Sequence, residues 1–177
     1  MQTQTQSKQK RKFLIAIAAI LVLISLAYVL TKSHDNNDKY ATTFPNLSLK
    51  SLNGNAITSL PILNNTQTII MLYQSECGSC YGVFDQIVNN LYDTPKIQVL
   101  MVSPDSLESI RNFKNRFDLD PDMPISFYQC NKMEAKKLFG NFLYPTVLLY
   151  SSEQKLLLKM DEIIDVDELF AKIAPNL

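Results

Sequence analysis

The sequence Glu-Cys-Gly-Ser-Cys at residues 76–80 lies between the apolar run TIIMLY (68–73) and the segment YGVFDQIVNNL (81–91). The run before it is continuous and of strand length, which is typical of a central strand buried on both faces. In the segment after it, apolar residues recur at the spacing of one helix face. These residues are Phe84, Ile87, Val88 and Leu91. The two cysteines are therefore expected at a strand–helix junction, with Cys77 at the N-terminus of the helix.

A cysteine in that position is suited to react as a thiolate. Unpaired backbone N–H groups and the helix dipole favour an anion at a helix N-terminus. In such Cys-x-x-Cys sites the pKa of the first thiol falls to roughly 3.5–7.5. Cys80 lies one turn further on, close enough to attack a mixed disulfide formed at Cys77. Between them, Gly78 is expected to permit a tight turn, and Ser79 adds no charge.

The N-terminus predicts a membrane anchor. Residues 13–30 are an apolar stretch in which Ser25 is the only clearly polar member. As a helix this stretch is about 27 Å long, close to the thickness of a bilayer's hydrocarbon core. The tail at 1–12 carries four basic residues and no acidic one, so the positive-inside rule keeps it in the cytoplasm. Residues 31–43 are predicted to be a polar linker, and residues 44–177 an exported domain.

A cleaved signal peptide is the alternative, because Ser25-Leu26-Ala27 is a small-x-small sequence that a signal peptidase accepts. The apolar run continues past this site through Leu30 without a polar region, which favours the uncleaved anchor. Both outcomes place the domain outside the cytoplasm, where disulfides persist. The anchored form faces the periplasm or outer surface, and the cleaved form is periplasmic or secreted. Three cysteines are too few for a disulfide scaffold, which favours a reactive role for the cysteines over a structural one.

The composition of the exported part predicts one α/β domain. Residues 31–177 hold 13 basic and 17 acidic residues without a Lys/Arg stripe, which argues against a nucleic-acid partner. An apolar content of 46% over the whole chain supports a packed core. Strand-type and helix-type segments alternate, as in a sheet covered by helices on both faces. A hairpin is expected at Asn53-Gly54, strands at 67–73, 96–103, 124–129, 144–150 and 155–160, and helices after Cys80, Asp105, Cys130 and Asp165.

This order of elements resembles the thioredoxin superfamily, and more narrowly the membrane-anchored TlpA/ResA-like thiol–disulfide oxidoreductases. The similar stretches are FPNLSLKSLNGNAITSL (44–60), LYQSECGSC (72–80) and FLYPTVLLY (142–150). The likeness extends over residues 44–177, with an insertion around 104–130. It implies a thioredoxin-like fold: a central mixed sheet flanked by helices, with an N-terminal hairpin extension, preceded by one transmembrane helix.

The resemblance also assigns roles to residues. Cys77 is implied to be the nucleophile and Cys80 the resolving thiol. Pro145 is implied to be a cis-proline beside the disulfide, where the backbone of Tyr144 pairs with a substrate peptide. Cis peptide bonds are a proline phenomenon, and a proline removes one backbone N–H near the sulfurs. The alternative for Tyr144-Pro145 is a trans proline on an edge strand.

Two departures from the family concern the tuning of the pair. Glu76 stands where the family usually has Trp, and this chain contains no Trp. A carboxylate beside Cys77 disfavours the thiolate, and this partly opposes the stabilisation of the thiolate by the helix N-terminus. The buried acid that related proteins carry near the site is missing from TIIMLY and from Gly78-Ser79. We therefore expect Glu76, Gly78 and Ser79 to tune the rate and the redox direction.

Other functions fit the sequence less well. A metal site needs two ligands besides the pair, and only Cys130 and His34 remain, the latter in the predicted linker. We expect no metal and no organic cofactor, because the disulfide itself carries the electrons. A cysteine peroxidase calls for Thr where Gln74 stands. A catalytically weak thioredoxin-fold interaction module at the membrane surface remains the alternative, motivated by the missing Trp and acid.

The predicted activity is thiol–disulfide exchange on proteins that carry cysteines or disulfides. A membrane-linked electron donor or acceptor is a possible partner. The reducing direction is implied by the resemblance alone. Cys130, which ends ISFYQC (125–130), is expected to be a small half-buried residue. A regulatory or intermolecular thiol is the alternative role for it.

Overall fold

The computed structural model describes residues 17, 20, 21, 48–57, 61–92, 94 and 96–173. The chain divides into two units, Met1–Lys39 and Tyr40–Leu177. Of the first unit, Ile17, Ile20 and Leu21 are described, and they are helical and exposed.

The predicted membrane anchor falls almost wholly outside these residues. The tail at 1–12, the linker at 31–43 and the rest of 13–30, including the cleavage site considered above, are not among them. Within the described part of the chain, no helix has both the length and the apolar character needed to cross a membrane.

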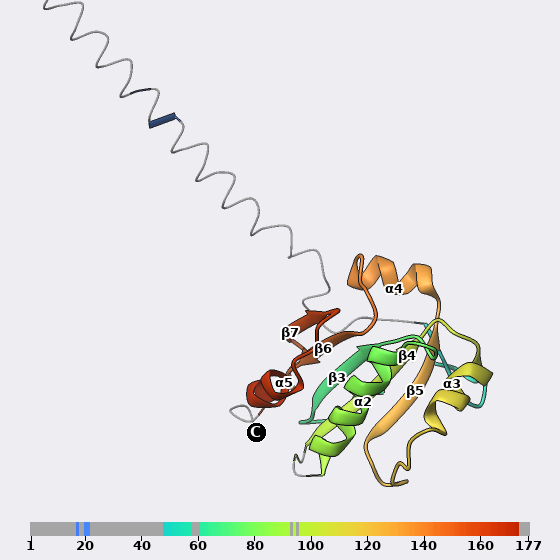
Figure 1. Cartoon of the computed structure of the whole chain (residues 1–177). Coiled ribbons are helices and arrows are strands. Elements are labelled where there is room, and N and C mark those ends of the chain that lie inside the picture. Colours follow the sequence, from blue (N-terminus) through green and yellow to red (C-terminus); the bar gives the residue numbers. More distant parts are fainter. Residues whose placement is uncertain are drawn as a thin grey trace, which may run out of the picture. The chain divides into compact units, whose positions relative to one another are not determined.

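The second unit is built on a mixed sheet with the strand order β2-β1-β5-β4-β3-β6-β7 (Figure 1). The strands are β1 (Leu49–Ser51), β2 (Ala56–Ile57), β3 (Gln67–Leu72), β4 (Ile97–Ser103), β5 (Ile125–Cys130), β6 (Thr146–Tyr150) and β7 (Leu156–Asp161). The helices are α2 (Gly78–Leu91), α3 (Leu107–Lys114), α4 (Lys132–Phe139) and α5 (Val166–Ile173). This is the predicted α/β architecture with a central mixed sheet.

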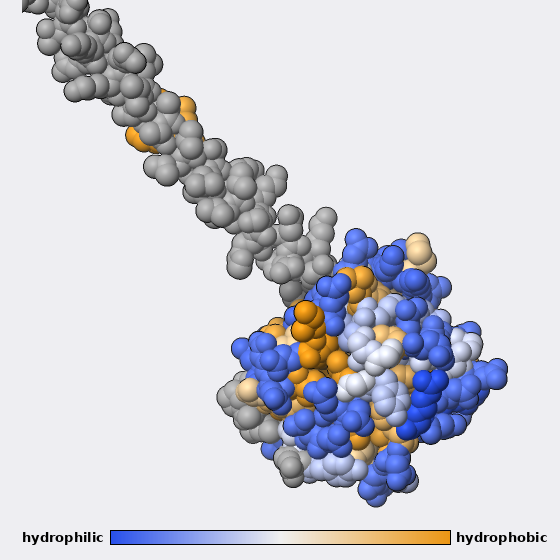
Figure 2. Space-filling view, viewed as in Figure 1, coloured by the Kyte–Doolittle hydropathy of each residue, from blue (hydrophilic) through white to orange (hydrophobic). Residues whose placement is uncertain are grey.

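The centre of the sheet is formed by β3 and β4, which run parallel and are buried along their whole lengths. Alternate residues of a strand face opposite sides of a sheet. Accordingly, Ile69 and Met71 join one core with residues of α2, α3 and α5, whereas Ile70 and Leu72 join a second core with residues of α4. Figure 2 shows the surface of the molecule in the same view as Figure 1. Most residues on the visible side are hydrophilic, and hydrophobic residues gather in a band beside α5.

The predicted hairpin forms one edge of the sheet. β1 pairs antiparallel with β2 and, on its other side, antiparallel with β5. Gly54 adopts a φ of 83°, a conformation that glycine tolerates better than other residues. Its N–H donates to the carbonyl of Ser51 at 2.8 Å. The hairpin extension expected from Asn53-Gly54 is therefore confirmed.

Candidate active site

Cys77 and Cys80 form a disulfide in which the sulfurs are 2.18 Å apart and the Cα atoms 5.2 Å apart. β3 ends at Leu72 and α2 begins at Gly78. Cys77 is the N-cap residue of α2, with extended backbone angles. The pair thus lies at the strand–helix junction predicted from the sequence.

Two hydrogen-bond donors meet at the sulfur of Cys77. The backbone N–H of Cys80 donates to it at 3.1 Å, which is the side-chain capping bond of the helix. The hydroxyl oxygen of Ser79 lies 3.3 Å from the same sulfur. Because a disulfide sulfur carries no hydrogen, the hydroxyl is the donor in this contact. Hydrogen bonds to the charged form of a thiol favour that form, so Ser79 contributes to the site directly although it adds no charge.

The two sulfurs differ in access. Cys80 is 0% exposed and belongs to the same core cluster as Phe84 of α2, whereas Cys77 is partly exposed at the edge of that cluster. A molecule that approaches from the solvent can therefore reach Cys77 but not Cys80. This asymmetry is the one that a nucleophile and a resolving thiol need.

Gly78, expected from the sequence to permit a tight turn, lies in the helix that follows Cys77. It is the first residue of α2, and a Cβ built on it meets no atom within 4 Å. Its φ is outside the positive range that favours glycine. The turn therefore makes no use of the backbone conformations that favour glycine. The residue instead leaves open space next to Cys77.

The Tyr144–Pro145 peptide bond is cis, as the resemblance implies, and the trans alternative does not hold. Thr146 pairs with Leu72 in the register of β6 against β3. Pro145 therefore lies at the end of the sheet where β3 leads into the disulfide. The backbone N–H of Glu162 donates to the carbonyl of Pro145 at 3.1 Å. This bond brings the segment of Glu162 beside the turn, and the next residue, Ile163, is 88% exposed.

Tyr144 is half-buried and contacts both cores. Burial raises the pKa of Tyr144 to about 12, with smaller contributions from Cys130 and Asp105. The phenol therefore keeps its proton at neutral pH. Its ring lies edge-on to Phe142, with ring centroids 5.4 Å apart. Leu143 between them is 54% exposed, so this turn offers an apolar surface.

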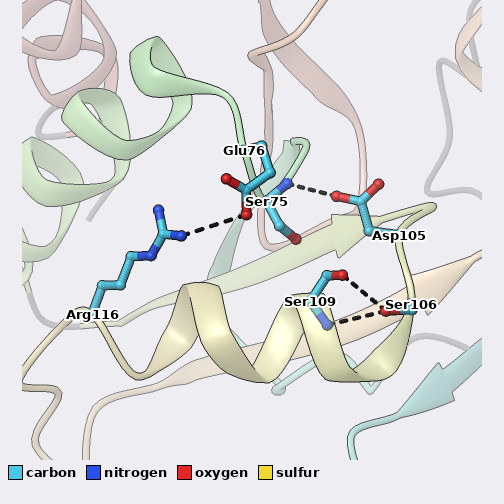
Figure 3. A network of polar contacts seen from close by, with 6 residues as sticks. All are labelled: Ser75, Glu76, Asp105, Ser106, Ser109 and Arg116. Atoms are coloured by element: carbon cyan, nitrogen blue, oxygen red, sulfur yellow. Dashed lines mark hydrogen bonds and ion pairs between the residues drawn. The ribbon is translucent and has the colours of Figure 1, made fainter.

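Glu76 is an exposed carboxylate. Its side chain is 84% exposed, and one oxygen lies 3.5 Å from the guanidinium of Arg116, which is itself 46% exposed (Figure 3). Exposed ion pairs of this kind contribute little to stability. The carbonyl of Arg116 accepts a hydrogen bond from the Tyr81 hydroxyl at 3.2 Å. Glu76 is therefore exposed, unlike the buried acid that the family resemblance implies near the site.

Asp105 belongs to the site although sequence reasoning did not assign it. Its carboxylate accepts the backbone N–H of Ser75, two residues before Cys77, at 2.6 Å (Figure 3). Its carbonyl accepts the side-chain amide of Gln129 at 2.7 Å. Parallel neighbouring strands end at the same edge of a sheet, and Asp105 follows β4 as Ser75 follows β3. The sequence places Asp105 just after a predicted strand, but the pairing of that strand with β3 comes from the structure.

Cys130 lies apart from the pair, as the last residue of β5. It is unpaired and 7% exposed. Burial raises the pKa of the Cys130 thiol to about 12, so it remains a neutral thiol. Among the residues that the structure describes, no three His, Cys, Asp or Glu side chains are grouped to hold a metal ion. His34 lies outside that part of the chain.

Comparisons with solved structures place this architecture among thioredoxin-like folds. A thioredoxin candidate from Neisseria meningitidis aligns with a TM-score of 0.62 and 24% identity, over 76% of this chain and 89% of that one. A thioredoxin-like protein from Aeropyrum pernix aligns with a TM-score of 0.61 and 17% identity, over 89% and 99%. A secreted disulfide oxidoreductase from Mycobacterium tuberculosis aligns with a TM-score of 0.57 and 12% identity, over 73% and 96%.

No protein-family model matches the sequence, and no curated protein matches it either. The likeness to solved structures, at identities below 25%, shows the fold alone. The chain therefore has a thioredoxin-like fold. Its activity has to be argued from its own residues.

Proposed function

We propose that the chain is a thiol–disulfide oxidoreductase that acts on protein thiols and disulfides through Cys77 and Cys80, as a reductant outside the cytoplasm. The observation that carries this proposal is the asymmetry of the pair. Cys77 is accessible and caps a helix, with two donors directed at its sulfur. Cys80 is buried one turn away. The cis-proline at the same end of the sheet supports the same function.

The reaction follows from this arrangement. The Cys77 thiolate attacks one sulfur of a substrate disulfide, and the other substrate sulfur leaves as a thiolate. A mixed disulfide between Cys77 and the substrate results. The Cys80 thiol then loses its proton and attacks the Cys77 sulfur, which releases the second substrate thiolate. The substrate gains two electrons, and the pair becomes the disulfide present in this structure. A membrane-linked electron donor would return the pair to its reduced state.

Leu143 and Ile163 support protein substrates over small thiols. Both side chains are more than half exposed, and both lie beside the cis-proline turn. An exposed apolar surface next to a reactive group is suited to contact the apolar side chains of a protein. We expect these residues to contact the substrate on the side of the cis-proline.

Trapping tests the activity. Cys80→Ser removes the resolving thiol, so the variant should accumulate mixed disulfides with partner proteins. Dithiothreitol should reduce these mixed disulfides and release the partner proteins. The double variant Cys77→Ser/Cys80→Ser is the matched control and should trap nothing. If Cys80→Ser also traps nothing and the wild-type disulfide does not cycle with dithiol reagents, the oxidoreductase proposal fails. Partner binding that survives both substitutions would then establish the interaction module.

The reduction potential of the pair tests the direction. A reductant should have a value near that of thioredoxin, about −270 mV, whereas a strong oxidant such as DsbA lies near −120 mV. Equilibration of the domain with glutathione buffers of known ratio measures this potential. A value near the oxidant's would reverse the direction and leave the activity class intact.

The location rests on the predicted anchor at residues 13–30 and on the resemblance to TlpA/ResA-like proteins. With the full chain expressed in a bacterium, we expect the protein in the membrane fraction after an alkaline wash, and digestion of its domain by protease added outside the cytoplasmic membrane. Sequencing the N-terminus of the recovered protein separates the anchor from a cleaved signal peptide, which would expose a new terminus near Tyr28. Protection of the domain from external protease would contradict the proposed location.

A further inference from the structure

An open cleft adjoins Cys77, and Tyr144 and Pro145 are not among its lining residues. Its volume is about 400 Å³, and it is lined by the loop after β3 and by the start of α3. The residues that line it are Gln74, Ser75, Glu76, Cys77, Asp105, Ser106 and Ser109. Figure 3 shows the loop residues Ser75 and Glu76 above the first turn of α3, with Asp105 beside them. A substrate residue next to the reacting cysteine would lie at this cleft.

Ser75 presents an unsatisfied hydroxyl there. The residue is 2% exposed, and its Oγ has no hydrogen-bond partner among the described residues. In Figure 3 this oxygen points toward Ser106 and Ser109, across the cleft. Their hydroxyls are engaged with each other at 2.8 Å. Buried polar groups are bonded in the great majority of cases, so a free hydroxyl aimed into a cleft indicates that a ligand group completes it.

The charges of the lining favour a cation. Among the described residues that line the cleft, the ionisable side chains besides Cys77 are the carboxylates of Glu76 and Asp105, and none is basic. One oxygen of Asp105 accepts the Ser75 N–H. The N-terminus of α3, where Ser106 accepts the N–H of Ser109 at 3.1 Å, carries only about half a positive charge, which is less than the two full negative charges of the carboxylates. Arg116 approaches Glu76 from outside the lining residues.

We propose that this cleft is a substrate subsite that receives a lysine or arginine side chain next to the reacting cysteine of the substrate protein. The cation donates to the Asp105 carboxylate and to the Ser75 hydroxyl. Ammonium and guanidinium groups are donors only, and their bonds to a carboxylate are charge-assisted and strong. The inference rests on the proposed function, since it names the substrates that the Cys77/Cys80 pair prefers.

Three peptides of equal length test the subsite. Each has one cysteine, flanked by Lys, Gln or Glu, as a mixed disulfide with thionitrobenzoate. The reduced protein reduces the probe by two electrons: Cys77 forms a mixed disulfide, Cys80 resolves it, and the peptide thiol and the coloured thionitrobenzoate are both released. Dividing each rate constant by the rate with dithiothreitol removes the intrinsic reactivity of the peptide. We expect this normalised rate constant to decrease from the Lys peptide to the Gln peptide to the Glu peptide, with about a tenfold difference between the Lys and Glu peptides.

Two variants separate the subsite from general charge effects. Asp105→Asn and Ser75→Ala should each lower the Lys/Glu ratio to about threefold or less, because each removes one of the two partners of the cation. Asp122→Asn is the matched control: it makes the same change of charge at an exposed residue outside the cleft and should keep the full ratio. The Gln peptide reports whether each variant still folds and reacts.

The outcomes are distinguishable. Equal rates for the three peptides, a faster Glu peptide, or a ratio that survives in both Asp105→Asn and Ser75→Ala would overturn the subsite and leave the oxidoreductase activity in place. A failure of the wild-type protein to reduce any of the peptides would overturn the proposed function itself.

Discussion

Cys77 and Cys130 lie at two equivalent junctions of the same sheet. β3 leads into α2 at one, and β5 leads into α4 at the other. At the first junction Cys77 itself caps the helix and accepts the N–H of Cys80. At the second, Asn131 caps the helix and accepts the N–H of Met133 at 2.8 Å, while Cys130 lies one residue earlier, within the strand. One thiol is thus placed on a helix terminus and the other in the core.

That difference of position changes the chemistry of the same side chain. At the helix terminus, Cys77 is accessible and receives donors that favour its thiolate. In the strand, Cys130 is desolvated, which favours its neutral thiol. We therefore expect the reactivity of a cysteine in this chain to depend on its position at the junction and not on the number of cysteines. Substitutions at the two junctions test this directly.

The largest contrast is expected between Cys77→Ser and Cys130→Ser. Loss of Cys77 removes the nucleophile, so reduction of a protein disulfide should fall by roughly 10³-fold or more. Cys130→Ser should keep the rate within about twofold, because Cys130 is buried and forms no disulfide in the proposed exchange, while a hydroxyl in a buried site lowers stability. The rates are measured with dithiothreitol as the electron source, beside urea unfolding of both variants. Equal losses of rate in the two variants would contradict the contrast.

A second contrast concerns alkylation of the reduced protein by iodoacetamide. At pH 8 we expect Cys77 to react and Cys130 to remain unmodified, because only the thiolate reacts and a pKa near 12 leaves about one Cys130 in 10⁴ ionised. Peptide mass spectrometry after timed quenching gives both rates. A Cys130 rate within tenfold of the Cys77 rate would show that the second junction does not protect its thiol.

The raised pKa of Cys130 also sets a pH dependence of stability. The unfolded chain releases the thiol proton near its ordinary value of 9.0, whereas the folded chain retains it up to about 12. The unfolded state therefore binds fewer protons in this range, and stability is lost as pH rises from about 9 to 12. The urea midpoint should fall less steeply over this range in Cys130→Ala than in the wild type. Buried tyrosines also make the urea midpoint depend on pH, but they are present in both proteins. The difference between the wild type and Cys130→Ala therefore reports Cys130.

The first junction was predictable because its signals are local. A continuous apolar run, a Cys-x-x-Cys and a helical repeat determine a buried strand, a cap and an amphipathic helix without reference to the rest of the chain. The hairpin at Asn53-Gly54 is equally local. The cis-proline came from resemblance to a family, since a Tyr-Pro sequence by itself does not determine the isomer.

The contacts that tune the site depend on tertiary structure. Asp105 reaches Ser75 only because β3 and β4 are parallel neighbours in register. Glu76 meets Arg116 across 40 residues of sequence. The open space at Gly78 is a property of its surroundings. Periodicity and spacing carry no record of these three features, so they gave no reason to assign Asp105 to the site or to expect open space at Gly78.

A smaller effect is expected from Ser79→Ala, which removes one of the two donors to the Cys77 sulfur. A hydrogen bond to a charged group contributes about 1.5 kcal/mol or more, so the rate of attack at neutral pH should fall roughly tenfold. The pH–rate profile should move to higher pH, because the thiolate is less stabilised. Ser152→Ala, at an exposed position in the turn before β7, is the control and should change neither quantity. A lower rate with an unmoved profile would assign Ser79 a structural role instead.

The smallest effect is expected from Gly78→Ala, and it tests what positions Cys77. If the junction depended on glycine's flexibility, alanine would strain it. The structure has Gly78 in the first turn of α2 with open space around its Cα, so alanine should fit and stabilise the protein by up to about 1 kcal/mol through reduced backbone freedom. Gly54→Ala is the opposite case, since its φ of 83° disfavours a Cβ, and it should destabilise the protein by about 1 kcal/mol. Urea unfolding of both variants decides the matter. Destabilisation by Gly78→Ala would mean that glycine, and not the capping bond to the Cys77 sulfur, determines the geometry of the first junction.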